Sequence, residues 1–375
     1  MLPYFSEIYG NAASKAHSFG WKAEAAVELA RKQIAGAINA EPKELIFTSG
    51  ATESINLAIK GIAESYKPKG NQIITSATEH KAVLDTCKSL EKKGHKVLYL
   101  KTDKHGLVNS DQLSTAISES TILVSIITAN NEIGSINDIA EIAKICNEKK
   151  VLFHTDATQA ICKVPIDMQK VKIDLMSFSC HKAHGPKGIG ALYIRDKFLK
   201  IKLTPQIDGG GHERGYRSGT LNVPAIIGFG KALKIGILEM KNETKKIKVL
   251  RDKLEKGISS KLENIRVNGH PLQRLYNNLN ICFEGVEADA LLLAVKDIAV
   301  SSGSACSSAF LQPSHVLKAI GLPDKLIKSS VRFGLSRFTT EEEIDYAIAK
   351  VVEKVNYLRD ISDSWKTSGM GLNVF

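Results

Sequence analysis

An aspartate and a lysine follow two stretches of the sequence that have the pattern of buried strands. The first stretch, 151–154, is followed by Asp156, and the second, 173–179, leads directly to Lys182. A lysine at the end of a core strand is expected to be partly desolvated, which favours its neutral, nucleophilic amine. If the strands are neighbours, this pair suits pyridoxal phosphate, which needs a lysine for its Schiff base and a carboxylate for its pyridinium nitrogen. The alternative is a surface lysine beside an unrelated loop.

A short stretch of small and polar residues, 49–54, follows another predicted strand and opens a helix. Small residues such as Ala51 let the backbone approach a ligand closely, and the amides of a helix N-terminus bind anions. The segment with Thr52 is therefore a candidate phosphate cup, although an ordinary helix cap would have the same pattern. Ser179 and His181, close to the lysine, could complete the phosphate shell.

Two further segments carry side chains that could act on the same ligand. His80 follows the predicted strand 72–75, where it could stack on a cofactor ring and shuttle protons near neutral pH, although a lone loop histidine is as often structural. The glycine-rich segment 209–220 contains Arg217 and Thr220, which could reach a phosphate, including that of a neighbouring subunit. The alternative for this segment is a flexible loop without a ligand.

A cysteine and an arginine of the C-terminal half are candidates for work on a substrate. Cys306 lies in the small, polar segment 301–308, which cannot pack in a core and leaves the thiol accessible as a nucleophile. The alternative is a surface cysteine of no consequence. Arg332 lies between apolar residues in the predicted strand 331–335 and needs an anionic partner. A substrate carboxylate would suit its two-pronged guanidinium.

The composition is that of a soluble globular protein with a basic surface. The 375 residues are 43% hydrophobic and 24% charged, and lysine-rich stretches such as 241–248 contribute much of the formal net charge of +11. No nucleic-acid-binding motif accompanies this charge, so we expect no direct nucleic acid partner. No apolar stretch suits a membrane span and no secretory signal is visible. The six cysteines are scattered, which predicts neither a metal site nor disulfides.

Predicted strands alternate with helices in the first part of the chain, which favours an α/β fold with a mostly parallel sheet. At this length we expect two domains: a large one at 1–235, and a smaller α+β domain at 236–375 that carries the Cys306 loop. Ligands of such sheets bind at the carboxyl ends of the strands. The predicted strands are 44–48, 72–75, 96–100, 121–126, 151–154, 173–179, 265–267, 277–283 and 331–335. The predicted helices are 21–38, a helix from 52, 81–93, 111–117, 136–148, 223–262, 288–295 and 341–359.

Together these segments resemble the cysteine desulfurases of the NifS/IscS type, members of the class V aminotransferase family with the type I fold of pyridoxal phosphate enzymes. The resemblance covers about residues 10 to 365. The cysteine motif and the stretch that follows Arg332 are similar to the housekeeping branch of that family. The motifs are TSGATES at 48–54, TEHK at 78–81, ANNEIG at 129–134, DATQ at 156–159, SCHK at 179–182, RSGT at 217–220 and SSGSACSS at 301–308.

The resemblance implies a homodimeric pyridoxal phosphate enzyme that converts L-cysteine to L-alanine and transfers the sulfur. It implies that Lys182 holds the cofactor and moves protons. Cys306 would carry the sulfur as a persulfide to an iron–sulfur scaffold or another acceptor, with tRNA thiolation as a further destination. No resident metal is implied, although Cys306 could transiently share a cluster ligand with a scaffold partner. The implied contacts are Asp156 with the pyridinium nitrogen, Gln159 with the ring hydroxyl, His80 over the ring, Ala51, Thr52, Ser179, His181 and the partner subunit's Thr220 at the phosphate, and Asn131 and Arg332 with the substrate carboxylate.

The chain departs from the family pattern in three places. Members of the family begin earlier, with a strand and an Ala-Thr-Thr-Pro-like turn beside the substrate site; either the start of this chain is assigned too late or the segment is absent. Cys180 stands where a small residue such as glycine is usual, and we expect a buried, neutral thiol there. Ala183-His184 and Ala12 replace Ile-Tyr and a proline, and we expect these changes to affect packing only.

Two other functions remain open from the sequence. One is a selenocysteine lyase or another pyridoxal phosphate lyase, which activity on selenocysteine in a Cys306→Ala variant would favour. The other is a non-catalytic relative that lost activity with its N-terminal segment, which failure to bind cofactor would support. We expect the cytoplasm of a bacterium as the compartment, with a mitochondrion or mitochondrion-related organelle as the alternative.

Overall fold

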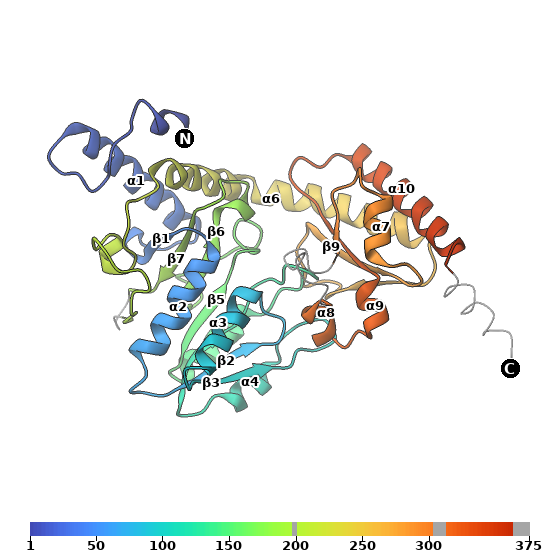
Figure 1. The fold of residues 1–375 in the computed structure, drawn as a ribbon, viewed down its shortest axis with the longest axis horizontal. Coiled ribbons are helices and arrows are strands. Elements are labelled where there is room, and N and C mark those ends of the chain that lie inside the picture. Colours follow the sequence, from blue (N-terminus) through green and yellow to red (C-terminus); the bar gives the residue numbers. More distant parts are fainter. Residues whose placement is uncertain (197–200, 303–312, 363–375) are drawn as a thin grey trace. The chain divides into compact units, whose positions relative to one another are not determined.

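The computed structural model describes residues 1–196, 201–302 and 313–362, and its chain divides into two compact units (Figure 1). Unit 1 comprises 1–101, 108–129 and 137–240. Unit 2 comprises 102–107, 130–136 and the residues from 241 onward. The division therefore falls inside one long helix, α6 (Val223–Ser259), and two short segments of the first half of the chain belong to unit 2.

Unit 1 is built on a seven-stranded sheet in the order β1-β7-β6-β5-β4-β2-β3. The pairs from β3 to β6 are parallel, and only β7 runs antiparallel to its two neighbours. The α/β fold with a mostly parallel sheet is therefore confirmed. The strands are β1 (Leu45–Thr48), β2 (Gln72–Ser76), β3 (Lys96–Leu100), β4 (Thr121–Ser125), β5 (Leu152–Asp156), β6 (Leu175–Ser179) and β7 (Gly190–Ile194).

Helices cover both faces of this sheet. Two of them, α2 (Ala51–Ser65) and α3 (Lys81–Glu91), lie side by side on one face, where their apolar stripes join the core with Leu175 and Leu192 (Figure 1). On the opposite face, the Phe178 ring of β6 meets Phe229 of α6 with ring centroids 5.7 Å apart. The other helices of unit 1 are α1 (Ser18–Ala37), α4 (Ser110–Ala116) and α5 (Ile139–Glu148), with short 3-10 helices η1 (Leu2–Phe5), η2 (Pro42–Glu44), η3 (Cys180–Ala183) and η4 (Glu213–Gly215).

Unit 2 has a four-stranded antiparallel sheet in the order β10-β11-β9-β8. Its core is formed by the sheet, the second part of α6 and the long helix α10 (Glu341–Asp360), which starts with a capping box between Thr340 and Glu343. The remaining elements are β8 (Ile265–Asn268), β9 (Asn278–Phe283), β10 (Ser301–Ser302), β11 (Ser330–Gly334), α7 (Ala288–Ala294), α8 (His315–Ala319) and α9 (Asp324–Lys328).

The strands predicted from the sequence all form, within a few residues at each end, but β7 and the two-residue β10 were not predicted. The β7 residues Gly190–Ile194 are fully buried and apolar, and they follow a turn rich in glycine and proline. A run of five apolar residues has no periodicity that separates a strand from a buried loop. The sequence therefore left the antiparallel pairing of β1 with β7 unseen.

Candidate active site

The candidate phosphate cup is the turn between β1 and α2. Gly50 is the N-cap residue of α2, and its carbonyl accepts hydrogen bonds from the Thr48 hydroxyl at 3.0 Å and the Ser54 amide at 3.1 Å. Ala51 and Thr52 are the first two helical residues; Ala51 is half-buried and Thr52 is exposed. The positive end of the helix dipole at this turn favours a bound anion, as the sequence predicts.

The cup depends on a close approach of β7 to the turn. A Cβ atom at Gly190 would lie 2.7 Å from the Gly50 Cα and 2.7 Å from the Phe178 carbonyl oxygen. Both neighbours are backbone atoms, so no change of rotamer could relieve the overlap. The Ser179 Oγ lies 3.9 Å from the position of a Cβ at Gly50, so the end of β6 also faces this turn.

Ser179 and His181 are joined in one polar contact beside the cup. The Ser179 Oγ lies 2.7 Å from the His181 Nδ1. Burial and the nearby charges of Lys182, Lys187 and Lys163 lower the pKa of His181, so its ring is neutral at neutral pH. A neutral imidazole and a hydroxyl can each donate one hydrogen bond to a phosphate oxygen.

Lys182 lies in η3, three residues beyond the end of β6. The expectation that this residue is partly desolvated is wrong for the protein alone, because Lys182 is exposed to solvent. The buried strand ends at Ser179, and the 3-10 turn carries the chain to the surface before it reaches the lysine. Lys163 donates a hydrogen bond from its Nζ to the Lys182 carbonyl at 2.8 Å, which fixes the backbone of this turn.

Asp156 is the last residue of β5, a buried strand adjacent and parallel to β6. The side chain is almost completely buried, and its Oδ1 accepts a hydrogen bond from the Thr158 amide at 2.9 Å. Burial raises the pKa of Asp156, while the hydrogen bonds of Thr158 and the charge of His80 oppose the increase. A cation such as a pyridinium placed on this carboxylate would favour its ionised form.

Glu79 is a second buried carboxyl group near Asp156, and the sequence analysis did not single it out. Its Oε1 accepts hydrogen bonds from the Ile127 amide at 2.8 Å and the Ser76 hydroxyl at 2.7 Å. Burial, together with the charge of Asp156, raises the pKa of Glu79 to about 8. Glu79 is therefore mostly protonated at neutral pH, which leaves less negative charge beside Asp156.

This carboxyl group gives the stability a pH dependence. Between its ordinary pKa of 4.5 and about 8, the folded protein keeps a proton on Glu79 that the unfolded chain has lost. The contribution of Glu79 to stability therefore falls as pH rises through that window, by up to about 1.4 kcal/mol per pH unit. We expect Glu79→Gln to remove this contribution, so that the slope of its unfolding free energy, measured by urea unfolding between about pH 5 and pH 8, differs from that of the wild type. The exposed control Asp85→Asn should keep the wild-type slope, and parallel profiles of wild type and Glu79→Gln would contradict the assignment.

His80 is the N-cap residue of α3 and lies beside the phosphate cup. Its Nδ1 accepts a hydrogen bond from the Ala82 amide at 3.1 Å, so the proton of a neutral ring is on Nε2. His80 and Thr52 line the same cavity of 340 Å³. Two larger cavities of unit 1, of 520 and 530 Å³, are lined by neither residue.

Gln159 is half-buried in the turn that follows β5. Its carbonyl accepts a hydrogen bond at 3.2 Å from Lys163, the same side chain that binds the Lys182 carbonyl at 2.8 Å. Lys163 thus connects the turn after β5 to the turn after β6, which carry Gln159 and Lys182. Lys163 was not predicted from the sequence, where its position four residues after Gln159 is the one signal that points to it.

Unit 2 brings together the two residues predicted to bind a substrate carboxylate. Arg332 lies on β11, and its Nη1 donates a hydrogen bond to the Asn131 carbonyl at 2.8 Å. Asn131 belongs to the segment 130–136, in which the Asn130 Oδ1 accepts hydrogen bonds from the Glu132 amide at 2.8 Å and the Ile133 amide at 3.0 Å. Both candidate side chains therefore stand on a part of the unit that is braced by hydrogen bonds.

The structure describes the candidate residues of the glycine-rich loop but not the cysteine of the loop 301–308. Arg217 was predicted as a possible phosphate ligand, but its Nε donates to the Glu53 Oε1 at 2.8 Å in the same chain. Thr220 is exposed to solvent. Cys306 lies outside the described residues.

Cys180 is buried and burial raises its thiol pKa, as expected of a neutral thiol.

The residues of unit 1 fit pyridoxal phosphate. A phosphate would find a glycine-lined turn at a helix N-terminus with Ser179 and His181 beside it. A pyridinium nitrogen would find the buried Asp156, and an aldehyde would find the amine of Lys182 in the turn that follows the adjacent strand. The described part of the chain has no group of three or more His, Cys, Asp or Glu side chains placed to hold a metal ion. Among the same residues no helix has the length and apolar character to cross a bilayer.

Comparisons with known proteins agree with these features. Two curated relatives are called cysteine desulfurase IscS. The protein of Anaeromyxobacter sp. strain Fw109-5 is 51% identical, and the match covers all of this chain and 92% of the relative. The protein of Rickettsia bellii strain OSU 85-389 is 52% identical, and the match covers all of this chain and 91% of the relative. Among solved structures, a NifS-like protein is 38% identical with a TM-score of 0.88, covering 95% of this chain and 94% of its own. A NifS-like protein from Rickettsia africae ESF-5 is 33% identical with a TM-score of 0.81, covering 94% and 92%. The family model described as aminotransferase class-V matches residues 1–347, and the chain therefore belongs to the class V aminotransferase family, with the type I fold of pyridoxal phosphate enzymes.

Proposed function

We propose that this chain is a pyridoxal phosphate-dependent cysteine desulfurase that converts L-cysteine to L-alanine. The sulfur would leave on Cys306 as a persulfide and pass to an acceptor protein of iron–sulfur cluster assembly. The observation that carries this proposal is the pairing of β5 with β6, which places Asp156 and Lys182 at the same edge of the sheet as the cup at Gly50. The name shared by the curated relatives, cysteine desulfurase IscS, supports the same reaction.

The bound cofactor would supply an electron sink for the negative charge that develops on the substrate. The protein residues orient it and move protons. Asp156 would accept a hydrogen bond from the pyridinium nitrogen, and Gln159 would contact the ring hydroxyl. His80 would lie over the ring, and the Lys182 amine would take a proton from the substrate and return one to the alanine product. Ala51, Thr52, Ser179 and His181 would hold the phosphate.

Two residues of unit 2 would bind the substrate and one would take its sulfur. The carboxylate of L-cysteine would be held by Arg332 and Asn131, which the structure already joins by a hydrogen bond. The Cys306 thiolate would form an S–S bond to the substrate sulfur as the substrate carbon–sulfur bond breaks. The carbon that loses sulfur would then take a proton and leave as alanine.

The exposed position of Thr220 supports a homodimer in which this residue serves the neighbouring site. Arg217 of the same loop is engaged by Glu53 of its own chain, whereas Thr220, three residues later, is exposed. The proposed acceptor is an iron–sulfur scaffold protein, and the proposed compartment is the bacterial cytoplasm.

Arg332 gives a test of substrate binding. We expect Arg332→Gln to lower kcat/KM for L-cysteine by about 10- to 100-fold, because a hydrogen bond to a charged group contributes about 1.5–3 kcal/mol. The loss should fall mainly on KM, with the absorption spectrum of the bound cofactor unchanged. Arg266→Gln, an exposed arginine on β8 of the same sheet, is the matched control. Equal kinetic losses in both variants would contradict the role of Arg332.

The proposed function is tested by the visible absorption spectrum of the purified protein before and after addition of L-cysteine, with alanine assayed in the same samples. We expect the cofactor band to shift while alanine accumulates. Persulfide on the acceptor thiol should accumulate in proportion to the alanine. A protein that takes up no added pyridoxal phosphate, or one that binds it but forms no alanine, would refute the proposal.

A further inference from the structure

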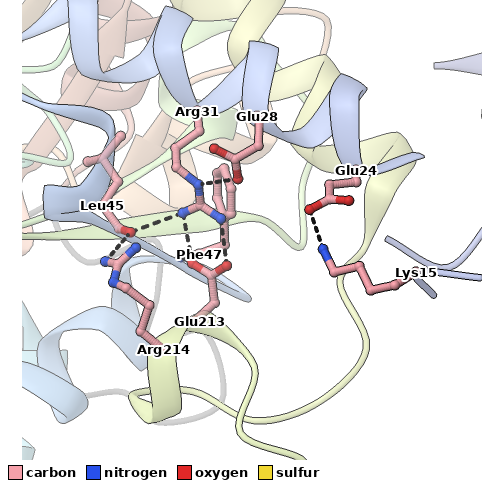
Figure 2. A network of polar contacts seen from close by, with 8 residues as sticks. All are labelled: Lys15, Glu24, Glu28, Arg31, Leu45, Phe47, Glu213 and Arg214. Atoms are coloured by element: carbon pink, nitrogen blue, oxygen red, sulfur yellow. Dashed lines mark hydrogen bonds and ion pairs between the residues drawn. The ribbon is translucent and has the colours of Figure 1, made fainter. Parts of the chain in front are cut away.

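The loop 209–220 is held to α1 and β1 by the buried carboxylate of Glu213. Glu213 is in η4, and its two carboxylate oxygens accept hydrogen bonds from the Arg31 guanidinium at 2.7 and 3.0 Å. The Oε2 also accepts a hydrogen bond from the Phe47 amide of β1 at 2.7 Å. Figure 2 shows this arrangement, with Glu213 reaching from its loop toward α1 and β1. One side chain thus connects the loop to two elements of the core.

Both charges of this ion pair are buried and well satisfied. The remaining contacts of Arg31 are the Leu45 carbonyl at 3.0 Å, the Glu28 carboxylate at 3.1 Å and the face of the Phe47 ring, 4.4 Å from its centroid. Burial alone would lower the pKa of Arg31. The hydrogen bonds and charges of Glu213 and Glu28 outweigh this effect, so the net result is a raised pKa. Loss of the Glu213 charge would leave a buried cation with one half-exposed carboxylate partner, which is costly.

The backbone of the loop is strained at the same point. Glu213 and Arg214 have φ angles of 48° and 57°, in the left-handed region that non-glycine residues rarely adopt. Such conformations persist only where surrounding contacts determine them, and they gather at functional segments. Arg214 adds a further contact by donating to the Leu45 carbonyl at 3.0 Å. The contacts of Glu213 and Arg214 therefore set the path of the chain that follows.

Hydrogen bonds inside the loop transmit that position to its far end. The Gly219 amide donates to the His212 Nδ1 at 3.3 Å, and the Gly211 amide donates to the Ser218 Oγ at 3.2 Å. These bridges connect the two residues just before Glu213 to the residues just before Thr220. A displacement at Glu213 would therefore move the whole segment from 217 to 220.

Arg217 connects the loop to the phosphate cup of its own chain. Its guanidinium donates to the Glu53 carboxylate at 2.8 and 3.4 Å, and Glu53 in turn accepts a hydrogen bond from the Ser49 amide at 2.9 Å. Desolvation alone would raise the pKa of the Glu53 carboxyl group. The hydrogen bonds from Arg217 and Ser49 and the charge of Arg217 outweigh this effect, so the pKa of Glu53 is lowered. Ser49 and Glu53 flank Gly50, Ala51 and Thr52, so this contact orders the turn on both sides of the cup.

We propose that Glu213 is a positioning residue for the phosphate of the cofactor, because its buried contacts with Arg31 and the Phe47 amide fix the loop from which Arg217 braces the cup. This inference rests on the proposed function, in which the cup binds pyridoxal phosphate. It makes Glu213 specific for the phosphate end of the ligand, since no described contact connects it to Asp156 or Lys182.

The test compares pyridoxal phosphate with pyridoxal, which lacks the phosphate, by titration of the apoprotein followed by visible absorption. We expect Glu213→Gln to weaken pyridoxal phosphate binding by about 10- to 100-fold, the range of a lost charged hydrogen bond, and to change pyridoxal binding less than about twofold. Glu28→Gln is the matched control, because it removes the other carboxylate on Arg31 and should leave both affinities unchanged. Equal weakening of both ligands would show a general structural role and overturn the inference, as would wild-type affinity for both. Failure of the wild-type protein to bind pyridoxal phosphate would refute the proposed function instead.

A second variant covers the case in which Glu213→Gln does not fold. Arg217→Gln removes the partly exposed end of the same chain of contacts and should show the same selective loss for pyridoxal phosphate. If Glu213 acts through Arg217, the double variant should bind no more weakly than the weaker single variant. Additive losses in the double variant, or an Arg217→Gln protein with unchanged affinity for pyridoxal phosphate, would overturn the proposed route.

Discussion

Lys182→Ala is expected to lose the visible absorption of the lysine-bound cofactor and to lower alanine formation from L-cysteine. The loss of proton transfer alone accounts for about 10²- to 10⁴-fold. Lys182→Arg should behave similarly, because a guanidinium keeps the positive charge but cannot react with the cofactor aldehyde. The measurement is a spectrum of each purified variant with added pyridoxal phosphate, followed by an alanine assay.

The matched control is Lys187→Ala, an exposed lysine just beyond the same turn. It should keep the cofactor spectrum and change alanine formation by less than about twofold, as is usual for surface substitutions. If Lys182→Ala retained the spectrum and the activity of the control, Lys182 would not be the residue that holds the cofactor. The arrangement of Asp156 and Lys182 on adjacent strands would then need another explanation.

Cys306→Ala is expected to stop persulfide formation while the cofactor spectrum stays intact. A nucleophile that accepts the substrate sulfur cannot be replaced by a methyl group, so we expect alanine formation from L-cysteine to fall by about 10²-fold or more. The measurement is a gel-based persulfide label on the protein together with an alanine assay. Cys282→Ala is a control for the label, because that thiol is buried on β9.

The same variant separates a desulfurase from a selenocysteine lyase. Selenium in selenocysteine can leave without attack by a protein thiol, so a lyase should process it after the Cys306→Ala change. A variant that retains activity on both L-cysteine and selenocysteine would contradict the role of Cys306. A variant inactive on L-cysteine and fully active on selenocysteine, with the wild-type protein also preferring selenocysteine, would favour the lyase.

The strand ends that carry Asp156 and Lys182 could be predicted because each follows an apolar run and the runs alternate with helices. That pattern indicates parallel strands, and parallel strands present their carboxyl ends at one edge. The exposure of Lys182 could not be predicted in the same way. It depends on the 3-10 turn at Cys180–Ala183, which is set by tertiary contacts such as the one from Lys163 rather than by local pattern.

The contacts that order the site are long-range, and the sequence alone does not reveal them. Arg31 and Glu213 are 182 residues apart, and Glu53 and Arg217 are 164 residues apart. Neither glutamate differs in its local sequence from an ordinary surface residue. The burial of Glu213 follows from the packing of η4 against β1, and Glu53 is held by Arg217 of the loop that contains η4. β7, which shapes the cup through Gly190, is a strand that periodicity did not identify.

The hydrogen bond from Arg332 to Asn131 joins residues 201 positions apart, and this separation has a consequence for synthesis on the ribosome. All strands of the unit 1 sheet lie before residue 195, so that sheet can form while the rest of the chain is still being made. Ile133, buried against Cys282 and Leu317 in the finished protein, stays uncovered until those residues emerge. A nascent chain therefore exposes this apolar segment while the unit 1 sheet can already be folded, which is the kind of surface that chaperones bind. The contact between Arg332 and Asn131 can form only after residue 332 has emerged, late in synthesis.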